Sequence, residues 1–167
     1  MKKIILSIAA VMTLGFGAAS MQAAPQEMGP GIVMAGSSSV SDLPQPALKF
    51  LSRHFKGVNV SKVDREYAQR TFEVDLENGV EIEFSNSGKV LEIDAPEGYA
   101  LNPQIVKGLV GRKMFGNLVK SGSANKVNSI DFTESKGKRV KVKTIASQPQ
   151  KILFDLSGNI LLIQPDD

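Results

Sequence analysis

The run Arg70–Phe84, "RTFEVDLENGVEIEF", constrains the fold more than any other part of the chain. Apolar and acidic residues alternate on both sides of Asn78-Gly79, as in two strands whose successive side chains point to opposite faces of a sheet. The apolar positions are Phe72, Val74, Leu76, Val80, Ile82 and Phe84, and the acidic positions are Glu73, Asp75, Glu77, Glu81 and Glu83. Asn-Gly between such strands predicts a two-residue turn with positive φ at both residues. The run therefore predicts an antiparallel hairpin with one buried face and one solvated face.

The end of the chain repeats part of this pattern. The segment "IEFSNSGKVLEI" aligns with "ILFDLSGNILLI", which places Phe84 over Phe154 at an offset of 70 residues. The same alignment places Gly88 over Gly158. Regular self-similarity of this kind indicates two structural repeats that share a core.

Each repeat begins with a segment whose apolar residues have helical spacing, 41–55 in the first and 101–115 in the second. Short stretches with strand patterns follow each segment. We therefore predict an α+β fold of two α-β-β-β-β repeats, with the helices packed on one face of an antiparallel sheet. The first repeat is assigned to residues 42–98 and a degenerate second repeat to residues 99–167.

The N-terminal region has the composition of an export signal. Lys2 and Lys3 precede an apolar stretch and then small residues, which is the order of a signal peptide (residues 1–24) cleaved within residues 20–24. Residues 25–41 are rich in Gly, Ser and Pro and predict a flexible leader. We therefore expect a periplasmic or secreted protein without stable membrane insertion. Loss of the two lysines lowers the formal net charge from +3 to +1, which argues against nucleic-acid binding.

Two stretches of the first repeat resemble a known family. "LPQPALKFLSRHFKGVNVSKV" followed by "FEVDLENGVEIEFSNSGKVLEID" resembles the tandem PepSY-like, beta-lactamase-inhibitor-like domains of exported bacterial proteins. The resemblance covers residues 43–94 and, more weakly, residues 101–164. The chain departs from the family pattern at Lys56, where a proline is usual, and in the helical region of the second repeat. The resemblance implies a helix-on-sheet protein that binds peptides or proteins and has no established catalysis.

The chain offers little for catalysis. It contains a single histidine, His54, and no cysteine, which excludes thiolate sites, disulfides and multi-histidine metal sites. The acidic side chains of the hairpin could bind Ca²⁺ through hard oxygen ligands, but ligands along flat strands rarely converge on one ion. No apolar residue is interleaved among them, so we expect a solvated face whose carboxylates stay ionised. No catalytic residue, cofactor or metal site is predicted, and the protein is not expected to be an enzyme.

Charge is distributed unevenly between the two repeats. Residues 42–98 hold 7 basic and 11 acidic residues, whereas residues 99–167 hold 11 basic and 5 acidic residues. The candidate partner-binding residues are Glu73, Asp75, Glu81 and Glu83 in the first repeat and Arg139, Lys141 and Lys143 in the second. A polarised surface can steer a charged partner or support head-to-tail self-association.

The leading hypothesis is an exported, non-enzymatic module that recognises a protein or peptide through this charge-polarised sheet surface. One alternative is an inhibitor of a peptidase or beta-lactamase that presents residues 113–125 as a rigid loop. A second alternative is a small Ca²⁺-binding module that uses the acidic hairpin. The sequence does not identify the partner.

Overall fold

A computed structural model describes residues 39–166 of the chain. The predicted signal peptide and nearly all of the predicted leader lie outside these residues. The first half of the described chain contains η1 (Val40–Asp42), α1 (Gln45–His54), β1 (Val60–Glu66), β2 (Thr71–Leu76), β3 (Glu81–Ser85) and β4 (Val90–Asp94). The second half contains α2 (Pro103–Lys120), β5 (Val127–Asp131), α3 (Glu134–Gly137), β6 (Arg139–Thr144), β7 (Gln150–Asp155) and β8 (Ile160–Pro165).

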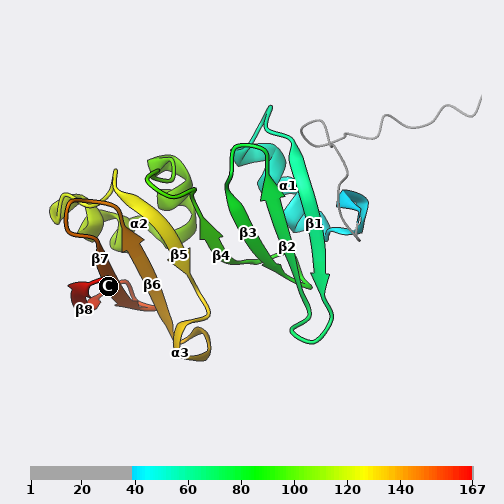
Figure 1. Cartoon of the computed structure of the whole chain (residues 1–167). Helices are drawn as coiled ribbons and strands as arrows, with labels where there is room; N and C mark the ends of the chain where they lie inside the picture. Colours follow the sequence, from blue (N-terminus) through cyan, green and yellow to red (C-terminus); the bar gives the residue numbers. More distant parts are fainter. Residues whose placement is uncertain (1–38, 167) are drawn as a thin grey trace, which may run out of the picture.

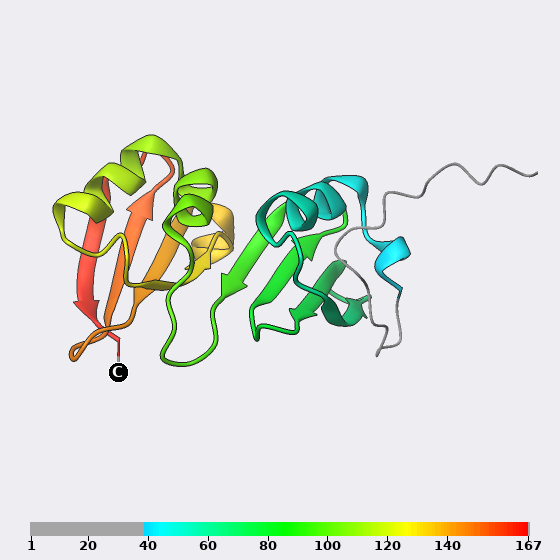
Figure 2. The ribbon, with the colours of Figure 1, turned by 90° about the horizontal axis from the view of Figure 1, so that it is seen from above.

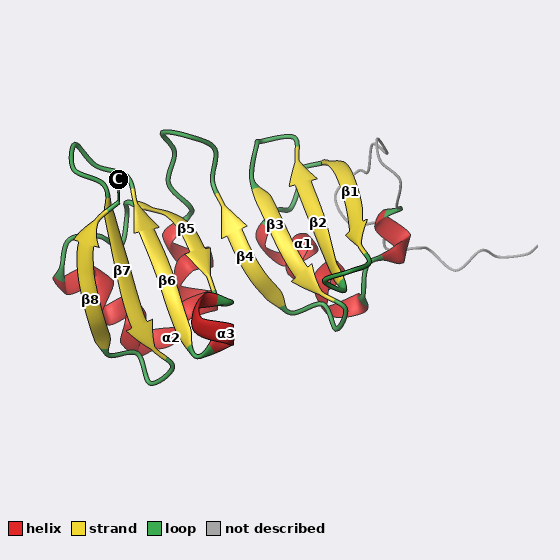
Figure 3. Cartoon of the chain, turned by 60° about the horizontal axis from the view of Figure 1, so that its bottom comes forward, coloured by secondary structure: helices red, strands yellow, loops and turns green. Residues whose placement is uncertain are grey.

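All eight strands form one antiparallel sheet in which the spatial order follows the chain order, with β1 and β8 at the two ends (Figures 1 and 3). Helices α1 and α2 lie on the same face of this sheet, each over the strands of its own half (Figure 2). The predicted α+β class and the twofold α-β-β-β-β order are therefore confirmed. The short α3, inserted between β5 and β6, was not predicted. No helix among residues 39–166 is long and apolar enough to cross a membrane.

The core lies between the two helices and the sheet and forms one continuous cluster of buried side chains. The alternation in the hairpin predicts its inner face correctly, since Val74, Ile82 and Phe84 are at most 1% exposed. Phe154, the counterpart of Phe84, is equally buried. Apolar burial of this kind is the main favourable term in folding, so it fixes which side of each strand faces the helices. The alternating residues then lie on the opposite, helix-free face.

The hairpin turn differs from the predicted two-residue turn. The Gly79 N–H donates to the Leu76 carbonyl at 2.8 Å and the Leu76 N–H donates to the Val80 carbonyl at 2.9 Å, so the loop spans three residues. Gly79 has φ of +79°, whereas Asn78 has no positive φ. This is a three-residue hairpin loop that ends in a left-handed glycine. Gly88 and Gly158 make equivalent bonds in the corresponding turns, to the Ser85 and Asp155 carbonyls.

The second helix is longer than predicted. Gly111, with φ of +76°, interrupts the helical geometry, and a further helical segment continues to Lys120. The stretch 113–125, considered above as a rigid inhibitory loop, therefore lies mostly within α2. Its Met114 is 7% exposed and its Leu118 is fully buried, because both pack into the core. This correction removes the loop on which that version of the inhibitor hypothesis depended.

Candidate binding face

The helix-free face of the sheet carries charged side chains in rows that cross the strands. The strand register places Glu83 beside Glu73 on one side and Glu92 on the other. A second row places Glu81 between Asp75 and Asp94. We call the acidic face the six carboxylates Glu73, Asp75, Glu81, Glu83, Glu92 and Asp94. Opposed carboxylates repel one another, so this arrangement does not serve the stability of the sheet.

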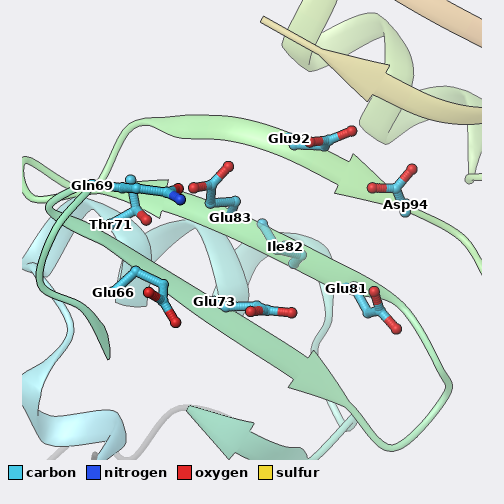
Figure 4. A pocket seen from close by; sticks show the side chains of 9 residues that line it. All are labelled: Glu66, Gln69, Thr71, Glu73, Glu81, Ile82, Glu83, Glu92 and Asp94. Atoms are coloured by element: carbon cyan, nitrogen blue, oxygen red, sulfur yellow. The ribbon is translucent and has the colours of Figure 1, made fainter. Parts of the chain in front are cut away.

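The acidic face is hollowed between β2 and β4 (Figure 4). The hollow has a volume of about 330 Å³. Its lining residues are Glu66, Gln69, Thr71, Glu73, Glu81, Ile82, Glu83, Glu92 and Asp94. Five of the six carboxylates of the acidic face therefore line one depression, which is large enough to hold one or two long side chains of a ligand.

Burial changes the protonation of two of these carboxylates. Burial, followed by the neighbouring charges of Asp94 and Asp131, raises the pKa of Glu92 from 4.5 to about 7, against the opposing effect of Lys141. Burial and the charge of Asp75 also raise the pKa of Glu73. Glu92 lies outside the set of hairpin carboxylates that were expected to stay ionised, so its raised pKa adds to that expectation and does not overturn it. Burial of this carboxyl is the main cause of the shift.

Thr71 adds a neutral polar group to the hollow. Its side chain is 5% exposed, and its Oγ1 has no hydrogen-bond partner among the described residues. A buried hydroxyl without a partner costs free energy. Thr71 lies on the same strand and the same face as Glu73 and lines the hollow beside it, with its hydroxyl below the accessible surface.

The acidic face is not neutralised by the described part of the chain. None of its six carboxylates forms an ion pair within residues 39–166, although the neighbouring Lys62 pairs with Asp64. The structure thus brings together the predicted residues Glu73, Asp75, Glu81 and Glu83, and adds Glu92 and Asp94, which the sequence analysis did not single out. In the stretch "KVLEID", apolar and acidic residues alternate, and this alternation predicts that Glu92 and Asp94 share one face of a strand.

The predicted basic residues lie on β6 and are partly neutralised. Lys141 contacts Asp131 at 2.7 Å and Glu134 at 3.6 Å, and Lys143 contacts Asp166 at 3.6 Å. Arg139 is exposed at the start of β6. Strand β5 alone separates β6 from β4, which lines the hollow, and the charge of Lys141 acts on Glu92 across it. Ion pairs therefore offset part of the positive charge of β6, whereas the acidic face has no ion pair among residues 39–166.

His54 lies on the opposite, helix-bearing side of the sheet, where its ring stacks against Phe50 with 4.8 Å between ring centroids. Partial burial and the charge of Arg53 lower its pKa. No group of three or more His, Cys, Asp or Glu residues within residues 39–166 has the geometry of a metal site.

The raised pKa of Glu92 predicts a pH dependence of stability. The folded chain keeps a proton that the unfolded chain loses above pH 4.5, so the contribution of Glu92 is fully present below that pH and is lost as the pH rises through about 7. We expect Glu92→Gln to be more stable than wild type by about 1 kcal/mol at about pH 8, since solvent screens this half-buried group. Urea denaturation at several pH values measures this difference. Glu97→Gln, in the exposed loop after β4, is the control. Parallel pH profiles for wild type and Glu92→Gln would contradict the assignment.

Comparison with known proteins finds one family. The family model described as "Putative beta-lactamase-inhibitor-like, PepSY-like" matches residues 35–92 and 72–162, two overlapping segments that span most of the chain. No curated protein matches the sequence.

Solved structures with the same fold come from Bacteroides. A protein from Bacteroides vulgatus, described as a "putative periplasmic protein of unknown function", has a TM-score of 0.58 and 21% identity, over 77% of this chain and 96% of that one. A protein from Bacteroides thetaiotaomicron, described as a "putative calcium-regulated periplasmic protein", has a TM-score of 0.57 and 22% identity, over 76% of this chain and 94% of that one. At these identities the comparison establishes a shared fold.

Proposed function

The chain belongs to the PepSY-like, beta-lactamase-inhibitor-like family, and from this premise we propose that it is an exported, non-enzymatic module that binds a cationic segment of a protein or peptide on its acidic face. Export is supported by the signal-like N-terminus and by solved structures of the same fold that are described as periplasmic. The observation that carries the binding proposal is a hollow lined by six carboxylates, five of them from the acidic face, that have no ion pair among residues 39–166.

The chemistry of the hollow favours lysine or arginine side chains. A guanidinium or ammonium group can approach two carboxylates from neighbouring strands, such as Glu83 and Glu92. Concentrated negative charge also accelerates the encounter with a cationic partner, and salt weakens this effect.

Calcium is the competing ligand, because one solved structure of this fold is described as calcium-regulated. The carboxylates here are spread along three strands (Figure 4), and none of the groups they form within residues 39–166 has metal-site geometry. The hollow is also much larger than one ion requires. These two observations favour a polypeptide over an ion.

The test is binding of the mature chain to a lysine-rich peptide and to a glutamate-rich peptide of equal length, measured by calorimetry. We expect saturable binding of the lysine-rich peptide alone, and a loss of at least about tenfold in affinity for the double variant Glu83→Gln/Glu92→Gln. The double variant Glu77→Gln/Glu97→Gln, whose carboxylates lie outside the hollow, should lose less than about threefold. Both double variants are measured at about pH 8, where Glu92 is largely ionised, so that each removes about two negative charges.

Three results would count against the proposal. Equal weakening by the two double variants would mean that only the net charge matters. Failure of the lysine-rich peptide to bind would exclude the cationic ligand. A rise in melting temperature with calcium that Glu83→Gln/Glu92→Gln abolishes would assign the face to the ion instead.

A further inference from the structure

Strand β8 is an apolar edge of the sheet. Ile160, Leu161, Leu162 and Ile163 are consecutive, and their exposed fractions are 38%, 50%, 43% and 46%. The strand pairs with β7 on one side and ends the sheet on the other (Figure 3). An exposed apolar edge strand presents unpaired backbone groups together with apolar side chains, and is therefore prone to pair with another strand.

The corresponding strand of the first repeat is covered by a neighbouring strand on both sides. At the offset of 70 residues, β8 corresponds to β4 and Ile163 corresponds to Ile93. Ile93 is fully buried because β4 is followed in the sheet by β5, whose Ile130 lies opposite it. Ile160 is likewise 38% exposed where its counterpart Val90 is 7% exposed. Strand β8 thus has the side chains of an interior strand without the next strand beside it.

The other end of the sheet does not provide a matching strand. The edge strand β1 carries Lys62, Asp64, Arg65 and Glu66. Charges on an edge strand oppose pairing with a further strand. Addition of β1 from one copy to β8 of another would place these charges beside leucine and isoleucine.

Strand β8 is complementary to itself. A bulge opposite Leu153 and Phe154 places Ile160 and Ile163 on the same face of the sheet, where they pair with Phe154 and Ile152. Antiparallel pairing of two copies about the middle of the run Ile160–Ile163 therefore sets Ile160 against the second copy's Ile163 on that face. The same pairing sets Leu161 against the second copy's Leu162. Such apolar cross-strand pairs stabilise a sheet. A twofold axis along the sheet normal keeps both sets of helices on the same face of the combined sheet.

We propose that two copies of the chain associate through antiparallel pairing of β8 with β8, which forms one continuous sheet. The contact is isologous and closed, so it yields a dimer and not a fibre. The edge contributes a small interface, which corresponds to a reversible dimer. The acidic face of each copy lies at the far end of the combined sheet and remains open.

Sedimentation equilibrium of the mature chain tests this association. Wild type is expected to be dimeric at about 100 µM, a concentration suited to a small interface, and Leu162→Lys should weaken dimerisation at least about tenfold. Val119→Lys is the matched control, because Val119 is 55% exposed on α2 and lies outside the edge. Circular dichroism checks that each variant is folded. A monomeric wild type at this concentration would overturn the proposal, as would equal weakening by the two variants.

Cross-linking then identifies the paired strands. The chain has no cysteine, so Leu161→Cys and Lys62→Cys each introduce a single thiol. A short bis-maleimide should link two copies of Leu161→Cys and should not link two copies of Lys62→Cys. Cross-linking that occurs only in a mixture of the two variants would overturn the symmetric pairing, because it would place β1 of one copy against β8 of another.

Discussion

Replacement of Phe84 by alanine is expected to lower the free energy of unfolding by about 3–5 kcal/mol. Phe84 is fully buried on β3, and its ring meets the ring of Phe50 of α1 edge-on, with 5.8 Å between centroids. Loss of the ring removes apolar burial and leaves a cavity between helix and sheet that the surrounding strands cannot fill. Urea denaturation followed by circular dichroism measures the change.

Phe154→Ala is the companion variant, because Phe154 occupies the same position in the second half and is fully buried. Both rings belong to one continuous core cluster, so each variant should shift a single, common transition. Tyr99→Ala is the control, since Tyr99 is 68% exposed and its loss should change stability by less than about 0.5 kcal/mol. Two separate transitions in Phe84→Ala would show that the two halves unfold independently.

The inner face of the hairpin was predictable because it depends on local alternation. Val74, Ile82 and Phe84 share a face whenever their strands are extended, and burial follows from their apolar character. The turn between the strands was predicted less well, since Asn78-Gly79 fits both a two-residue loop and the end of a three-residue loop. Strand β2 ends at Leu76, so Glu77 joins the loop and Gly79 alone takes positive φ.

The acidic face was only half predictable. Glu73 and Glu83 share a face by local alternation, but Glu92 joins them through the pairing of β3 with β4, which shifts register at a bulge. The pKa of Glu92 depends further on Asp131, which the pairing of β4 with β5 brings beside it. Such neighbours are set by tertiary register, which no local pattern specifies.

Tertiary register also explains why the basic residues of β6 are less exposed as free charges than the sequence predicted. Lys141 was expected to be part of an open basic surface, yet it is paired with Asp131 and Glu134. Lys143 is near Asp166, at the end of the chain. Net charge counted along the sequence therefore overstates the free charge on a surface, because cross-strand ion pairs cancel part of it.

Replacement of Gly88 by alanine is the other change for which we expect a large effect, a loss of about 2–4 kcal/mol in the free energy of unfolding. Gly88 has φ of +78°, a conformation that costs a residue with a Cβ about 1 kcal/mol. The β3–β4 turn also packs against the beginning of α1. A Cβ on Gly88 would lie 2.8 Å from the backbone nitrogen of Ala47 and 3.1 Å from the Cβ of Pro44. Because the obstruction is partly backbone, α1 must move away from the sheet.

Gly98→Ala separates these two contributions. Gly98 has φ of +79°, almost the same as Gly88, but a Cβ there would meet nothing within 4 Å. Its replacement should therefore cost only the conformational part, about 1 kcal/mol. Urea denaturation of both variants gives the difference, which measures how tightly the turn holds α1 against the sheet. If the two variants lost equal stability, the contact between the turn and α1 would contribute nothing. The need for a positive φ would then be the whole reason for a glycine at position 88.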